Sequence, residues 1–154
     1  HPESGGPWQA LSRAAFEEGR HREAVETYAK YLQQGQRTPD ELATFAGLAL
    51  HALDFEAAEA ALAGLDELAP GHPEALAKRA LLEMYHGRFD EAETACLRVL
   101  EQQPEHAAAY TILSRLRRGR LDDGQLERVR GVAERADADL DRRIPAAFAV
   151  AHAY

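Results

Sequence analysis

Apolar and small residues recur along this chain at a spacing of 34 residues, without a gap. Ala24, Ala58 and Ala92 lie in register. Three further sets share this register, five residues before, three before and four after the alanines: Gly19, Leu53 and Gly87; His21, Phe55 and Phe89; Tyr28, Leu62 and Cys96. A fixed period of this length is typical of stacked supersecondary units. It favours a binding surface over a catalytic pocket as the basis of function.

Each period predicts a first helix that ends at a glycine or polar turn and a second helix that ends before a proline or polar loop. The predicted helices span residues 7–18, 21–34, 40–52, 55–68, 74–86, 89–102, 107–118, 123–136 and 141–154. They form three units (5–38, 39–72, 73–106), a degenerate fourth (107–140) and half a unit (141–154). We therefore expect an all-α fold of about nine helices in one domain over residues 7–154, preceded by a disordered tail or linker at residues 1–6.

Small residues are predicted where the two helices of a unit cross. Ser12, Ala46 and Ala80 recur at this position of the first helices, and Ala24, Ala58 and Ala92 face them from the second helices. Small side chains let two helix backbones approach closely. A large charged residue at Ala58 should therefore unfold the domain.

Composition and charge disfavour some classes of function but do not identify one. Hydrophobic residues make up 45% of the chain and charged residues 29%, and the net charge of −8 disfavours nonspecific binding to nucleic acid. No apolar run approaches the roughly 20 residues of a membrane span. The first residues show no signal peptide and no initiator methionine, so we expect a processed or excised segment and leave the compartment open between cytoplasm and periplasm.

The repeated residues resemble the tetratricopeptide repeat family, whose 34-residue unit carries W-x2-L-G-x2-Y, then A-x3-F, then P. The matching residues are Trp8, Leu11, Ala24 and Tyr28 in the first unit, Ala46, Ala58, Leu62 and Pro70 in the second, and Ala80, Gly87, Phe89, Ala92 and Pro104 in the third. Ser12, Gln36 and Leu53 depart from the pattern. The resemblance implies a right-handed α-solenoid of antiparallel helix pairs whose first helices line a concave groove.

The resemblance also implies which residues face that groove. They are Arg13, Phe16, Leu50, His51, Met84, Tyr85, Arg115 and Arg118. Apolar side chains flanked by arginines suit a partner peptide or helix, because apolar anchors supply affinity and arginine supplies orientation. The alternative for Leu50 and Met84 is that they pack between adjacent first helices. The family members that bind chaperone tails use lysines and asparagines, and this chain has no asparagine.

The remaining candidate groups, a basic run, the histidines and Cys96, are better explained by structural roles than by binding or catalysis. The basic run Arg115–Arg120 could grip an anion, but cations at a helix end also offset the helix dipole. The histidines lack metal-ligand spacing, and Cys96 falls at a core position. We expect no metal, no cofactor and no enzymatic activity, since no convergent polar cluster is evident. The leading hypothesis is a noncatalytic interaction scaffold.

The last predicted helix is apolar nearly all round. The stretch Ile144–Tyr154 would need a cover on its outer face, either a following helix within the parent chain or a second copy in a homodimer. Residues 107–154 also resemble the region between repeats and catalytic domain in bacterial repeat-containing sulfotransferases, through Leu113–Leu116 and Arg143–Tyr154. The alternative function is therefore a regulatory or targeting arm of a larger enzyme.

Overall fold

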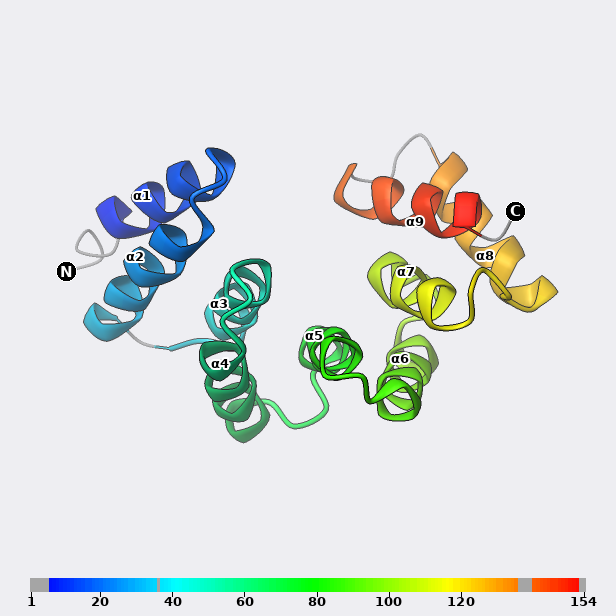
Figure 1. Cartoon of the computed structure of the whole chain (residues 1–154), viewed down its shortest axis with the longest axis horizontal. Helices are drawn as coiled ribbons and strands as arrows, with labels where there is room; N and C mark the ends of the chain where they lie inside the picture. Colours follow the sequence, from blue (N-terminus) through cyan, green and yellow to red (C-terminus); the bar gives the residue numbers. More distant parts are fainter. Residues whose placement is uncertain (1–5, 36, 136–139, 153–154) are drawn as a thin grey trace. The chain divides into compact units, whose positions relative to one another are not determined.

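The computed structural model describes residues 6–35, 37–135 and 140–152, except for the side chains of residues 140–142 and 152. Within these ranges the chain forms nine α-helices and no strand (Figure 1). They are α1 (Gly6–Glu17), α2 (His21–Gln34), α3 (Pro39–His51), α4 (Phe55–Leu68), α5 (Pro73–Tyr85), α6 (Phe89–Gln102), α7 (Ala107–Leu116), α8 (Asp123–Glu134) and α9 (Leu140–His152). Each helix end lies within two residues of the predicted one. Gly6 belongs to α1, and the rest of the predicted tail lies outside the described residues.

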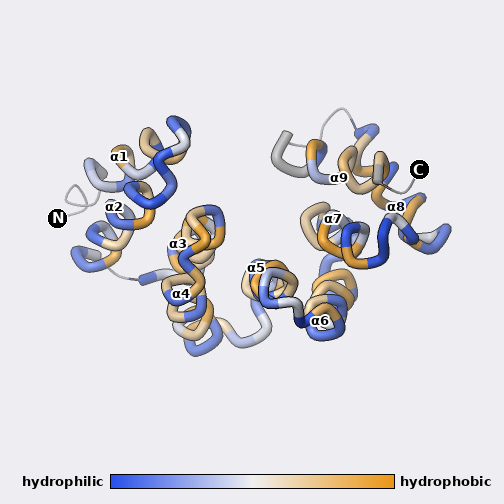
Figure 2. The backbone as a smooth tube through the Cα atoms, in the orientation of Figure 1, coloured by the Kyte–Doolittle hydropathy of each residue, from blue (hydrophilic) through white to orange (hydrophobic). Residues whose placement is uncertain are grey.

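The chain divides into two compact units, residues 1–78 and 79–154, and the division falls inside α5. Each unit is described by itself below, and the single domain over residues 7–154 stays a prediction. In both units the helices carry apolar and polar positions on different faces, as Figure 2 shows. Such helices are stable only when the apolar face is covered.

Unit 1 contains two antiparallel helix pairs, α1 with α2 and α3 with α4. The first pair crosses at Ser12, whose side chain is 1% exposed and whose hydroxyl donates to the Ala24 carbonyl at 2.7 Å. Ala46 and Ala58 hold the corresponding positions of the second pair, and both are completely buried. The small residues predicted at the crossings therefore lie in the core.

One turn geometry joins the two helices of each of the first three repeats. Gly19, Leu53 and Gly87 follow the first helix with left-handed φ values of 76°, 56° and 75°. The N–H groups of this residue and the next donate back into the last turn, which satisfies two carbonyls at the helix end. The bonds run from Gly19 to Phe16 and Arg20 to Ala15, from Leu53 to Leu50 and Asp54 to Ala49, and from Gly87 to Met84 and Arg88 to Glu83.

The first helices begin at residues that recur at the same spacing. Thr38 caps α3 in a capping box with Glu41, which exchanges hydrogen bonds between each backbone N–H and the other side chain. At the equivalent position before α7, the Nδ1 atom of His106 accepts from the Ala109 N–H at 3.2 Å. Histidine recurs in these loops at His72 and His106, and His106 therefore caps a helix in unit 2.

Unit 2 packs its last three helices differently from the helix pairs of unit 1. Helix α9 contacts both α7 and α8 extensively, whereas α7 and α8 contact each other little. Two hydroxyls on α7 donate to α9 carbonyls, Thr111 to Pro145 at 2.9 Å and Ser114 to Ala149 at 3.4 Å. Ala149 is completely buried. The face of α7 that carries the small residue is therefore covered by α9 rather than by the second helix of its own repeat.

Candidate functional site

The predicted groove residues of unit 1 include an aromatic contact between two first helices. Phe16 at the end of α1 meets His51 at the end of α3 edge-on, with ring centroids 5.1 Å apart and an interplanar angle of 80°. The His51 ring is fixed by a 2.9 Å hydrogen bond between its Nδ1 atom and the Gly47 carbonyl. His21 joins the pair, at 5.0 Å from Phe16 and 6.1 Å from His51. These three rings form the aromatic cluster of unit 1.

An open hollow of about 670 Å³ lies beside this cluster. It is lined by His51, Ala52 and Leu53 from the end of α3, and by Gly19, Arg20, His21, Arg22, Glu23 and Glu26 from the start of α2. The His21 Nδ1 atom is buried and has no hydrogen-bond partner among the described residues.

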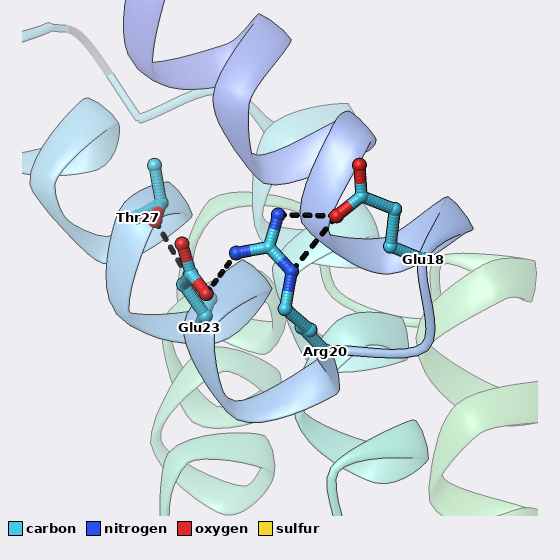
Figure 3. A network of polar contacts seen from close by, with 4 residues as sticks. All are labelled: Glu18, Arg20, Glu23 and Thr27. Atoms are coloured by element: carbon cyan, nitrogen blue, oxygen red, sulfur yellow. Dashed lines mark hydrogen bonds and ion pairs between the residues drawn. The ribbon is translucent and has the colours of Figure 1, made fainter.

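Arg20, beside the hollow, forms ion pairs with two nearby carboxylates. Figure 3 shows the Arg20 guanidinium between the carboxylates of Glu18 and Glu23, and the Thr27 hydroxyl donates to the Glu23 carbonyl at 2.6 Å. The hydrogen bonds with Glu23 and Glu18 raise the pKa of Arg20 above its usual range. Arg20 is therefore engaged within its own repeat, which leaves Arg13 and Arg22 as the more available cations of this region.

The other predicted residues of unit 1 have contrasting exposure. Arg13 is exposed on α1. Leu50 is 1% exposed, although its neighbour His51 is exposed. One residue along a helix turns the side chain by about 100°, so neighbours can face the core and the solvent. The burial of Leu50 agrees with the packing alternative for this residue.

Unit 2 carries the remaining predicted residues at the ends of two first helices. Tyr85 is 47% exposed at the end of α5, and Met84 beside it is half-buried. On α7, the Arg115 guanidinium lies over the Phe148 ring of α9, 5.0 Å from the ring centroid. Arg118 is exposed just after α7 and has a left-handed φ of 51°. The structure places Arg115 and Arg118 at one helix end, and ties Arg115 to the last helix.

Sequence reasoning missed His21 as a member of the cluster. The signal was present, because His21 occupies the register position of Phe55 and Phe89 and so is an aromatic position of the repeat. Its proximity to His51 could not be read from the period, which aligns equivalent positions but does not pair different ones. The surface between α2 and α4, described below, was missed as well.

Reactive and metal-binding groups are few in the described part of the chain. Burial raises the pKa of the Cys96 thiol to about 12, so the thiol stays protonated and unreactive at neutral pH. Among the residues in the described ranges, no group of three or more histidines, cysteines or carboxylates could hold a metal ion. None of the helices in those ranges combines the length and apolarity needed to cross a membrane.

Comparison with known proteins agrees with this geometry. The family model of the tetratricopeptide repeat matches residues 49–116, which run from the last turn of α3 to the end of α7. Residues 49–116 therefore carry tetratricopeptide repeats. The all-α fold of the chain is that of the family, as the sequence predicts. No curated protein gives a significant match, so the resemblance of residues 107–154 to sulfotransferase repeat regions stays a prediction.

Solved tetratricopeptide structures share the fold at low sequence identity. The TPR domain of Arabidopsis OM64 has a TM-score of 0.65 at 19% identity, covering 75% of this chain and 95% of that domain. The second TPR domain of human RPAP3, in complex with the HSP70 peptide SGPTIEEVD, gives 0.59 at 22% identity, covering 74% and 98%. YrrB, described as a TPR protein with an unusual peptide-binding site, gives 0.60 at 18% identity, covering 96% and 73%. Identities this low extend the likeness to the fold and no further.

Proposed function

We propose that this chain is a noncatalytic scaffold that binds a partner peptide or helix on the surface of its first helices. We call Arg13, Phe16 and His51 of unit 1 the first-helix surface, and Met84, Tyr85, Arg115 and Arg118 are the candidate contact residues of unit 2. Leu50 is left out because it is buried. Tetratricopeptide domains of the same fold bind peptides, as with RPAP3 and its HSP70 peptide, and this supports the proposal.

The observation that carries the proposal is the contact between Phe16 and His51. Two adjacent first helices each contribute an aromatic ring to one patch, beside an open hollow. The exposed His51 side chain is held in place by Gly47, so little conformational entropy would be lost on binding. Fixed aromatic side chains at the surface are typical anchors of protein interfaces.

The partner should differ from the chaperone tails that related domains bind. The RPAP3 ligand ends in Glu-Glu-Val-Asp. This chain has no asparagine, and its two lysines, Lys30 and Lys78, are not among the predicted groove residues, so the lysine and asparagine set that holds such a terminus in the family is not present. Arginines are instead the cations among the predicted groove residues. We expect a peptide whose bulky apolar side chains contact the aromatic patch and whose carboxylates pair with arginine.

Peptides selected from a random library on the immobilised protein test this proposal. The affinity of a selected peptide is then measured for the wild type and for the combined variant Arg13→Ala, His51→Ala and Tyr85→Ala. We expect a loss of about tenfold or more, because truncating anchors at an interface commonly costs more than 1 kcal/mol each.

A control variant removes an equal number of exposed side chains from second helices. Gln34, Arg98 and Gln102 are exposed on α2 and α6, and their replacement by alanine should leave the affinity unchanged. Circular dichroism of both variants checks that they are folded. Equal binding by the wild type and the first-helix variant would place the peptide on another surface.

A further inference from the structure

The second helix of the middle repeat has an outer face unlike that of its neighbours. On α4 this face carries Ala60, Gly64 and Leu68, spaced four residues apart along one side of the helix. The first repeat has Glu26, Lys30 and Gln34 at the same positions, and the third has Thr94, Arg98 and Gln102. These six are all exposed. Polar side chains therefore cover this face in two repeats, whereas small or apolar side chains occupy it in the middle repeat.

This difference leaves an apolar groove within unit 1. A cavity of about 410 Å³ lies between α2, α3 and α4, in the size range of about 300–1,000 Å³ typical of ligand pockets. Its floor is formed by Leu32, Leu42 and Ala61, which are at most 6% exposed. Its walls include Ala29, Phe45 and Gly64. We call this cavity the α2–α4 groove.

The rim of the groove combines exposed apolar surface with charge. Leu68 lines the groove and is 54% exposed, so it adds apolar surface to the rim. Phe45 stacks on Tyr28 with ring centroids 6.1 Å apart, so the wall is fixed before any ligand enters. Gln33, Arg37 and Glu67 supply the polar rim.

Charge and shape select one kind of occupant. Helix α4 carries four acidic residues, Glu56, Glu59, Asp66 and Glu67, and no basic residue. Ala60 and Gly64, four residues apart on one face of α4, leave a shallow channel into which the ridge of another helix fits. We propose that the α2–α4 groove binds an amphipathic helix of a partner protein, with a large apolar side chain in the groove and lysines or arginines facing α4. This surface is distinct from the first-helix surface and does not depend on the function proposed above.

A designed peptide tests the proposal directly. The probe is a fluorescein-labelled, alanine-based helical peptide of about 16 residues, with leucines along one face and lysines at its flanks. Binding is followed by fluorescence anisotropy at low salt. We expect saturable binding that weakens as salt rises, and no binding of a second peptide in which glutamates replace the lysines.

The variant Gly64→Lys restores the residue type of the first and third repeats. A Cβ at Gly64 would meet the Leu42 Cδ1 atom at 3.4 Å, an ordinary contact, and lysine favours a helix more than glycine does. The variant should therefore fold and lose affinity for the probe by about tenfold or more, since its side chain fills the groove. The matched control is Gly131→Lys on α8, where a Cβ meets nothing within 4 Å. It makes the same change of charge and should bind like the wild type.

Three results would overturn the proposal. The first is a wild type that does not bind the lysine peptide, and the second is equal binding by Gly64→Lys and wild type. The third is a molecular mass that rises with concentration in the wild type and not in Gly64→Lys, measured by light scattering. That result would identify a second copy of the chain as the occupant.

Discussion

The first three repeats and the fourth differ in one short turn, and the difference changes which helices pack together. In the first three, the residue that closes the first helix is also the N-cap of the second, at Arg20, Asp54 and Arg88. In the fourth, the closing bonds come from Arg118 to Arg115 and from Gly119 to Ser114, whereas the next N-cap is Asp122. The loop between Gly119 and Asp122 separates α7 from α8, so the turn geometry of the first three repeats does not set the direction of α8.

The start of α8 nevertheless keeps the register of the repeat. Phe55, Phe89 and Asp123 begin second helices 34 residues apart, and Ala107 begins α7 in register with Pro73. Only the end of α7 comes early. The sequence suggests that the whole fourth repeat is degenerate. In the structure the 34-residue register is broken at one place, the end of α7. The consequence is large because α9 then covers the face of α7 that a second helix covers elsewhere.

The strongest test of this comparison places a charge at the crossing position. Ala58 is completely buried against the first helix of its repeat, so Ala58→Arg should cost about 4 kcal/mol or more and unfold unit 1. The register equivalent in the fourth repeat is Leu126, which is partly exposed. Leu126→Arg should cost far less, and Ala149→Arg on α9 should be as damaging as Ala58→Arg.

Thermal unfolding monitored by circular dichroism measures all three variants. If Leu126→Arg destabilised the protein as much as Ala58→Arg, α8 would be packed on α7 in the regular way. An unchanged melting temperature for Ala58→Arg would mean that the repeat register itself is wrong.

These examples show which parts of the structure the sequence could predict. Helix ends are encoded locally, by Pro39 and Pro73 at helix starts and by glycines in the turns, so they were predicted to within two residues. The packing of α9 in place of α8 against α7 could not be predicted, because it depends on which of the two helices covers that face of α7 better. Leu126 is a larger residue than the alanine of other repeats, and Ala149 offers a smaller one.

The candidate site was predictable to a similar extent. The period places Leu50 at the position equivalent to Phe16 and His51 one residue later, both at the ends of first helices, and the structure brings Phe16 and His51 into contact. The period could not show that Leu50 is buried and His51 exposed, because this depends on how α3 is rotated against its neighbouring helices. The α2–α4 groove was missed because the repeat pattern emphasises shared positions, whereas the groove arises where the middle repeat differs.

A second prediction concerns the turn residue itself. Leu53 adopts the left-handed conformation that Gly19 and Gly87 adopt, at a cost of roughly 1–2 kcal/mol for a residue with a Cβ atom. Because its side chain is 60% exposed, Leu53→Gly should raise the free energy of unfolding by about 1 kcal/mol. Arg118→Gly should have a similar effect in the fourth repeat. Urea denaturation measures both, and Gly19→Leu provides the opposite control, which should be destabilising.

A third prediction uses the joint between the first two repeats. The Tyr31 hydroxyl donates to Glu41 across α2 and α3, whereas the equivalent joint between α6 and α7 has the buried Val99 and Ala109. Burial alone would raise the pKa of Glu41, but hydrogen bonds from Tyr31 and Thr38 outweigh it and lower that pKa. The hydrogen bond that Tyr31 donates to Glu41 raises the pKa of Tyr31 to about 12.

The effect of Tyr31→Phe should therefore depend on pH. A lowered carboxyl pKa contributes stability above its usual range and loses it as the pH falls through the folded value. Tyr31→Phe should cost about 1 kcal/mol at pH 7 and much less once Glu41 is protonated. Unfolding by urea at a series of pH values from 7 downward measures this difference. Glu41→Gln, which cannot ionise, should abolish the pH dependence of the Tyr31→Phe effect, and a cost that does not fall as the pH is lowered would contradict the assignment.

The smallest effect compares the two crossing serines. Ser12 donates to Ala24 at 2.7 Å within its own repeat, and Ser114 donates to Ala149 of α9 at 3.4 Å. Because hydrogen bonds weaken with distance, Ser12→Ala should cost about 1 kcal/mol and Ser114→Ala about half of that or less. Both alanines fit, since Ala46 and Ala80 occupy the equivalent buried positions. Urea denaturation of the two variants under identical conditions gives the ordering. A larger cost for Ser114→Ala would show that the contact between α7 and α9 is tighter than the regular crossing it replaces.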